Sequence, residues 1–96
     1  MKPLFLPLYC EHFDAFASGQ KRHEYRRYGA RWNEQTCWIG RPVILSCGYG
    51  RQARLQAVIL SFERLAIDAV PVTVSRIYPN ARKIAVIELA ATIKDS

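Results

Sequence analysis

The sequence lacks the features that mark several large classes of protein. No hydrophobic run approaches the length of a membrane-spanning helix, and residues 1–9 are too short and too broken by Pro3 and Pro7 for a signal peptide. There is no internal repeat, linker or low-complexity segment. The length of 96 residues predicts a single domain, residues 1–96, and the hydrophobic half of those residues is enough to form its core. With no long apolar run, no membrane contact is expected.

Cysteine is scarce and irregularly spaced. The three cysteines are an odd number and include no Cys-x-x-Cys pair. They predict a reduced, cytoplasmic protein whose thiols are free and buried. The alternative is a zinc site formed by Cys10, His12, Cys37 and Cys47, but their spacing matches no zinc module. We therefore expect no metal and no cofactor.

Acidic residues are few. Eight Asp and Glu oppose fourteen Lys and Arg, which gives a net charge of +6. Residues 1–54 carry nine cations and four acids, a balance of +5, whereas residues 55–96 carry five and four, a balance of +1. Ten of the cations are arginine, whose planar group binds phosphate and stacks on bases. This charge favours a polyanionic partner such as RNA or DNA.

Short apolar runs separated by glycine and proline predict a mainly β fold, either a small curved sheet or a barrel rather than a parallel sheet. Helical spacing over residues 10–18 predicts one helix of about two turns that ends at Gly19. A short helix or irregular turn is expected between Pro71 and Pro79. Strands are expected at residues 3–9 (an edge strand), 21–28, 43–47, 54–67 and 83–93. The second half of 54–67 is expected to bend into a loop.

One segment, residues 18–32, gathers cations and aromatic residues around a single acid. Gly19, Lys21, Glu24 and Arg26 spell G-x-K-x-x-E-x-R. On a strand, Glu24 and Arg26 share a face because alternate residues point the same way. Lys21 comes from the preceding turn and can reach over that face. The spacing therefore predicts that Glu24 and Arg26 lie on one strand face, with Lys21 at the mouth of the turn beside it.

The G-x-K-x-x-E-x-R pattern resembles the signature of the ASCH family. Two other parts of the chain are similar to that family: the loop at residues 38–40 with the strand after it, and residues 77–79 followed by a strand at 86–88. The resemblance covers residues 4–92. It implies a mainly β (α+β) fold, a small PUA-like β-barrel with one prominent N-terminal helix. It also implies that the motif lines a basic cleft between helix and barrel, where RNA or nucleotide binding has been proposed.

The first functional hypothesis is accordingly a module that binds RNA or a nucleotide. Lys21 and Arg26 would hold a phosphate or a polar base edge, and Glu24 would accept from an amino group or fix the two cations in place. Further ligand contacts are expected from the neighbouring Arg22, Arg27, Tyr28 and Arg31. The alternative is that Glu24 and Arg26 form only a structural ion pair.

A second hypothesis is a small hydrolase, either an amidohydrolase or a ribonuclease. The chain resembles compact amidohydrolases that act on acetylated cytidine, in which the motif lysine works with a hydroxyl residue and a carboxylate. Lys21 matches that lysine, but Glu24 stands where the hydroxyl residue is expected. Glu63 or Asp68 could replace the carboxylate, although nothing in the spacing indicates it. If the protein is an enzyme, Lys21 and its neighbour Glu24 are the expected catalytic residues. A third hypothesis is a protein-interaction module whose basic face binds an acidic partner. The two histidines, His12 and His23, are not expected to be catalytic: each is expected at the surface or at its boundary with the core.

Overall fold

The computed structural model describes residues 2–48 and 53–91, and these residues form one mainly β unit. The strands are β1 (Leu4–Leu8), β2 (His23–Arg27), β3 (Pro42–Cys47), β4 (Arg54–Ala66) and β5 (Lys83–Ala91). The helices are α1 (Cys10–Ala17) and α2 (Val72–Ile77), with a 3-10 turn at Ile67–Ala69. The predicted chain order of strands and helices is confirmed. Within the described ranges, neither helix has the length and apolarity that a membrane span requires.

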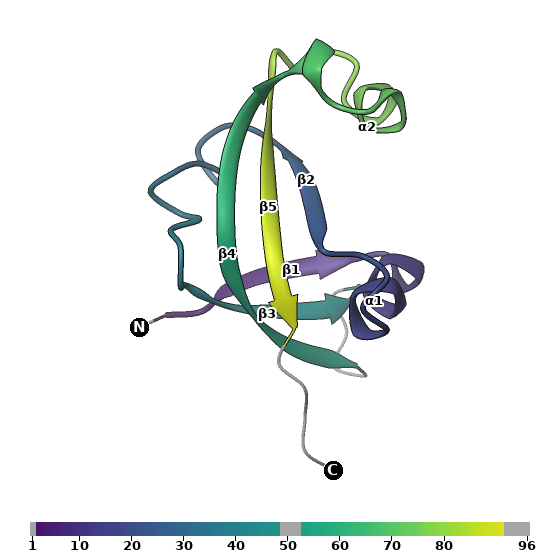
Figure 1. Cartoon of the computed structure of the whole chain (residues 1–96), viewed down its shortest axis with the longest axis vertical. Coiled ribbons are helices and arrows are strands. Elements are labelled where there is room, and N and C mark those ends of the chain that lie inside the picture. The colour runs from purple at the N-terminus through teal and green to yellow at the C-terminus, as the bar shows by residue number, and fades with distance from the viewer. Residues whose placement is uncertain (1, 49–52, 92–96) are drawn as a thin grey trace.

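The five strands form a single curled sheet in the order β1-β3-β4-β5-β2. Figure 1 shows it as a half-barrel, with α1 beside the ends of β1 and β3, and α2 beyond the far end of β4 and β5. Neighbouring strands are antiparallel except β1 and β3, which are parallel. The predicted curved sheet is therefore confirmed, with one parallel pair that the sequence pattern did not indicate. The connection through α1, β2 and a long loop lets β3 return parallel to β1.

The longest strand, β4, corrects one expectation. Its second half was expected to bend into a loop, but it stays extended to Ala66 because it pairs with β5 along that half. The register shifts between Ile59 and Ser61, so Leu60 is an extra residue in the ladder. A bulge of this kind bends a strand while preserving the hydrogen bonds on either side of it. The bulge thus helps β4 to span the curved sheet.

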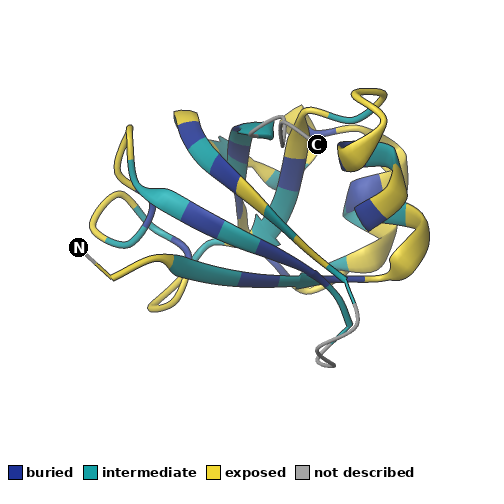
Figure 2. Ribbon diagram, turned by 90° about the horizontal axis from the view of Figure 1, so that it is seen from below, coloured by how far each residue is buried: buried dark blue, intermediate teal, exposed yellow. Residues whose placement is uncertain are grey.

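The inner face of the sheet carries the main core. Figure 2 shows buried residues alternating with more exposed ones along the strands, as a half-buried strand requires. Phe13 and Phe16 of α1 pack into the same cluster as the strand side chains. A smaller cluster of buried residues, Val70, Val74, Ala81 and Ile84, fixes α2 to the other end of the sheet. The two helices are therefore anchored independently, one at each end.

The end of α1 brings the motif into place. Gly19 has φ +83°, the left-handed conformation that favours glycine, as predicted. Its N–H donates to the Phe16 carbonyl (3.2 Å), and the Lys21 N–H donates to the Ala15 carbonyl (3.0 Å). These bonds satisfy carbonyls that the helix leaves open at its end. They turn the chain directly from α1 into β2, with Lys21 at the mouth of the turn.

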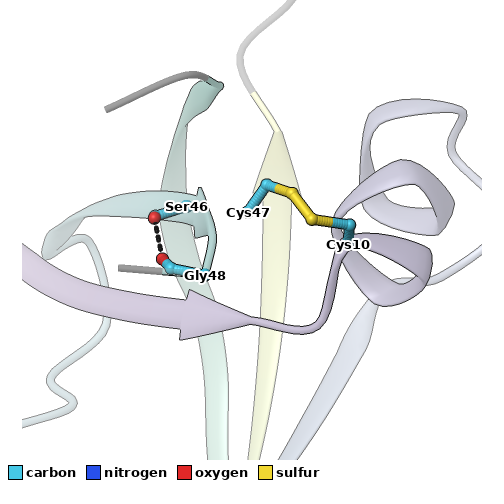
Figure 3. The surroundings of a disulfide bond; sticks show 4 residues. All are labelled: Cys10, Ser46, Cys47 and Gly48. Atoms are coloured by element: carbon cyan, nitrogen blue, oxygen red, sulfur yellow. Dashed lines mark hydrogen bonds between the residues drawn. A yellow bond between two sulfur atoms is a disulfide. The ribbon is translucent and has the colours of Figure 1, made fainter. Parts of the chain in front are cut away.

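The cysteines overturn another expectation. Cys10, at the start of α1, and Cys47, at the end of β3, are joined by a disulfide, and their Cα atoms lie 4.6 Å apart (Figure 3). Only Cys37 is a free, buried thiol among the described residues. The sequence did not show the pairing because the two cysteines are 37 positions apart in the chain, and only the parallel pairing of β1 with β3 brings them together. A disulfide also weighs against the predicted cytoplasmic location.

Cys37 is expected to be unreactive in the folded protein. It is 1 % exposed, and burial raises the pKa of its thiol, so the nucleophilic thiolate is suppressed at pH 8. We expect a thiol reagent such as DTNB to titrate no thiol in the native oxidised protein and one thiol after unfolding in guanidinium. Rapid reaction of one thiol in the native state would contradict the burial of Cys37, and reaction of three would contradict the disulfide.

Candidate functional site

A cleft of about 650 Å³ lies between the start of α1 and α2. One side of the cleft is formed by the end of β1, the first turn of α1, the turn after α1 and strand β2. Helix α2 and the residue that follows β3 complete it. The lining residues are 7–9, 12, 21, 24–26, 48, 73–74 and 77–78. Most of these side chains are apolar or aromatic. The polar ones include Lys21, Glu24 and Arg26, the three charged residues of the G-x-K-x-x-E-x-R motif. The cleft thus combines apolar walls with a few convergent polar groups, as small-ligand sites do.

Glu24 is the centre of the polar group. One carboxylate oxygen, Oε1, accepts from Lys21 Nζ at 3.2 Å, and the other, Oε2, accepts from Arg26 Nε at 3.1 Å and Nη2 at 2.9 Å. The Glu24 side chain is 10 % exposed, whereas those of Lys21 and Arg26 are 22 % and 21 % exposed. A carboxylate this deeply placed needs partners, since an unpaired buried charge is costly. The two cations provide them and remain open to the cleft.

Lys21 has a second neighbour, His12, which the sequence placed at the surface or its boundary. His12 Nδ1, on α1, lies 3.2 Å from Lys21 Nζ. An ammonium group has only donors, so Nδ1 accepts and the proton of a neutral imidazole sits on Nε2. The Lys21 ammonium also lies 5.3 Å from the centre of the Phe16 ring. Nothing in the sequence pattern indicated the contact with His12, because the two residues are nine positions apart and the end of a helix lies between them.

Arg26 bridges the two edges of the half-barrel. Its Nη2 donates to the carbonyl of Pro7 in β1 at 2.6 Å, while the guanidinium holds Glu24 on its own strand, β2. The guanidinium also lies 5.0 Å from the centre of the Trp32 ring, which is buried in the core. β1 and β2 are the two edge strands of the sheet and are not paired with each other, so this side chain links the two edges. Arg26 is thereby fixed at the floor of the cleft.

Comparison with solved structures shows which fold this is. The chain is similar to the crystal structure of a mutant of ZmASCH from Zymomonas mobilis, with a TM-score of 0.72 and 13 % sequence identity. The similarity covers 94 % of this chain and 70 % of that one. The fold is ASCH-like. No protein-family model matches the sequence, and no curated protein matches it.

Within this ASCH-like fold, the polar group retains unused hydrogen-bonding capacity. Lys21 has three N–H donors and uses two of them, and Arg26 Nη1 has no hydrogen-bond partner among the described residues. Glu24 Oε1 accepts one bond and can accept another. A ligand in the cleft would therefore meet donors on both cations and an acceptor between them.

The wall opposite α1 is formed by α2 and by two tyrosines. Tyr78 donates from its hydroxyl to the Tyr25 carbonyl at 3.1 Å, and burial raises the pKa of Tyr78. Its hydroxyl is therefore a neutral donor that is already used. Thr73, Val74 and Ile77 add one face of α2 to the same wall. The sequence pattern did not assign these residues to the site, because only the packing of α2 on β5 and Tyr25 brings them beside β2.

The remaining predicted ligand contacts do not line the cleft. Arg22 pairs with Glu88 at 3.3 Å, Arg31 lies 5.5 Å from the Trp32 ring, and Arg27 is exposed near the end of β2. Their role as outer phosphate contacts stays a prediction.

Tyr28 lies elsewhere, packed against Phe62 with its hydroxyl donating to Glu34. That bond raises the pKa of Tyr28 and lowers the pKa of Glu34. Its ring is partly buried and packs against the core cluster, and its hydroxyl also accepts from Arg64 Nη1 at 3.5 Å at the surface. The predicted stacking on Tyr28 therefore has no support from the cleft.

Other chemistry-bearing residues also stay apart from the cleft. Glu63, on β4, and Asp68, in the 3-10 turn, are exposed and do not line it. Glu24 is therefore its one acidic side chain among the described residues. Over the same part of the chain, no group of three or more His, Cys, Asp or Glu side chains is placed to hold a metal ion.

Proposed function

We propose that the chain is a binding module for RNA, or for a nucleotide derived from it, and that the ligand occupies the cleft at Lys21, Glu24 and Arg26. The observation that carries this proposal is the network of those three side chains, which keeps free donors on both cations and a free acceptor on Glu24. Phosphate oxygens and base carbonyls need such donors, and an exocyclic amino group needs such an acceptor.

The size and walls of the cleft support a nucleotide unit rather than a duplex. A volume of about 650 Å³ lies in the range of sites for small organic ligands. Sequence-specific RNA recognition uses unpaired bases that are splayed out and packed on side chains. The apolar walls suit the faces of a base, and the cations suit its phosphate. The net charge of +6 adds long-range attraction for a polyanion.

Replacement of Lys21 is expected to weaken both RNA binding and its salt dependence. In a fluorescence-anisotropy titration with a short single-stranded RNA, we expect Lys21→Ala to bind about 10-fold more weakly, because a charge-assisted hydrogen bond is worth roughly 1.5–3 kcal/mol. Removing one cation that pairs with a phosphate should also lower the slope of log K against log salt by about 0.7 for a single strand.

The matched control is Lys2→Ala, which removes the same charge from a residue outside the cleft. It is expected to stay within about twofold of the wild type, as a distant exposed charge should. Equal affinity for RNA in the wild type and Lys21→Ala, or a flat response to salt, would overturn the proposal.

A second candidate, a small hydrolase, is favoured by the contact between Lys21 and His12. The Lys21 ammonium donates to His12 Nδ1 at 3.2 Å in a largely apolar cleft, and a hydrogen-bonded acid and base of this kind can pass a proton. Against it, neither Glu63 nor Asp68 reaches the cleft to supply a second carboxylate. Turnover of an acylated cytidine or of RNA, abolished in both Lys21→Ala and His12→Ala, would establish this candidate. Absence of turnover across such a panel would count heavily against this candidate.

A further inference from the structure

Tyr9 is exposed yet lines the cleft. Its residue is 80 % exposed, the largest exposure among the large hydrophobic residues that the structure describes. Its main chain is fixed, because the Tyr9 carbonyl accepts from the N–H groups of His12 (2.9 Å) and Phe13 (3.0 Å) in the first turn of α1. The main chain of Tyr9 is therefore fixed beside the cleft, while most of the surface of its ring remains available.

The wall across from Tyr9 offers a second apolar surface. Ile77, on α2, is 67 % exposed and lines the same cleft. Exposed apolar side chains on two sides of one cleft gain free energy when a flat apolar ring covers them. A nucleobase is such a ring, and it would lie above the cations that serve its phosphate. An aromatic side chain stacks on a base face without regard to sequence.

The disulfide lies beside Tyr9. Cys10 follows it directly, and Cys47 is followed by Gly48, another residue of the cleft. The Gly48 N–H also donates to the Leu8 carbonyl at 2.7 Å. The disulfide and this hydrogen bond therefore add to the β1–β3 strand pairing in holding the segment that carries Tyr9 against the end of β3. Cys10 is exposed and Cys47 is half-buried, so a small reductant can reach this bond.

We propose that the ligand stacks on the ring of Tyr9 and that the part of the ligand in the cleft is a single unpaired base. In this proposal the Cys10–Cys47 disulfide positions Tyr9. This inference rests on the proposed function and adds the form of nucleic acid that the cleft takes. A base inside a duplex has both faces covered, so it offers Tyr9 no surface. Reduction by an external dithiol gives each sulfur one electron and one proton, oxidises the dithiol to its own disulfide, and removes the covalent link between the Tyr9 segment and the end of β3.

The stacking role is tested on the oxidised protein with a short single-stranded RNA that contains 2-aminopurine. Tyr9→Ala is expected to bind about 10-fold more weakly and to lose the fluorescence quenching that stacking produces, while Tyr9→Phe keeps both. Ile39→Ala is the control, because Ile39 is 70 % exposed and does not line the cleft. Affinity and quenching of Tyr9→Ala within twofold of the wild type would overturn the inference. So would a wild-type protein that binds duplex RNA as tightly as single-stranded RNA of the same sequence.

The positioning role is tested by comparing oxidised and dithiol-reduced protein at low temperature, with folding checked by circular dichroism. Reduction is expected to weaken binding at least threefold in the wild type and to leave Tyr9→Ala unchanged. An equal decrease in both proteins would show that the disulfide does not act through Tyr9. Should the reduced chain unfold, the comparison is made in sucrose, which favours the folded state.

The two levels of proposal fail differently. If the wild type binds no RNA or nucleotide, the proposed function is wrong. If binding depends on Lys21 but not on Tyr9, the function stands and the stacking inference alone is wrong.

Discussion

Replacing both bonded cysteines, as Cys10→Ala/Cys47→Ala, is expected to lower the free energy of unfolding by about 3–4 kcal/mol. The disulfide closes a loop across a sequence separation of 37 residues, and the entropy it removes from the unfolded chain corresponds to that value. A domain of this size has a total stability of roughly 5–10 kcal/mol, so the decrease is a large fraction of it. Urea denaturation of the wild type and the variant, followed by circular dichroism, measures the difference.

The same experiment carries its own control. Adding a reductant to the wild type is expected to reproduce most of the decrease in stability, whereas adding it to the double variant should change nothing. By thermal denaturation, the effect corresponds to a decrease in Tm of roughly 15–25 °C. An unfolding curve of the wild type that does not respond to reductant would show that this bond does not stabilise the domain.

Removing the Glu24 carboxylate is expected to be the most damaging single substitution at the cleft. Glu24→Ala leaves Lys21 and Arg26 side by side in a poorly solvated position without their shared counter-charge. Breaking a buried ion pair by removing one partner costs about 3–5 kcal/mol, and the partial exposure of both cations reduces this to about 2–4 kcal/mol. Chemical denaturation at neutral pH measures it.

Two further variants show whether the ion network causes that destabilisation. Glu63→Gln neutralises an exposed acid on β4 and should change stability by no more than about 0.5 kcal/mol. In the double variant Glu24→Ala/Arg26→Ala the cost should be less than the sum of the single costs, since residues in one network are not additive. A Glu24→Ala protein as stable as the wild type would mean that Glu24 is held for ligand binding and not for the fold.

The secondary structure could be predicted closely because its signals are local. Gly19 ends α1 through its own left-handed conformation, and Phe13 and Phe16 mark the buried side of the helix by their spacing. The strands follow from short apolar runs between turn residues. The second half of β4 was missed because its residues 60–66 are mostly polar or half-buried, and only pairing with β5 keeps them extended.

The candidate site was predicted in part, and the division follows chain distance. Lys21, Glu24 and Arg26 are near neighbours along one turn and one strand, so their spacing alone placed them together. His12, Tyr9 and the face of α2 join them through contacts between segments that are remote in sequence. The Cys10–Cys47 bond was missed for the same reason, since no sequence pattern shows that β1 and β3 are paired in parallel.

By itself the sequence determined the order of helices and strands, the turn that delivers Lys21, and the G-x-K-x-x-E-x-R spacing on β2. Those features depend on backbone preferences and side-chain alternation within a few residues. The tertiary structure alone decided which strands are neighbours, how α2 faces α1 across the cleft, and which cysteines bond. These depend on burying apolar surface from distant segments in one core, a requirement of the whole chain that no short segment contains.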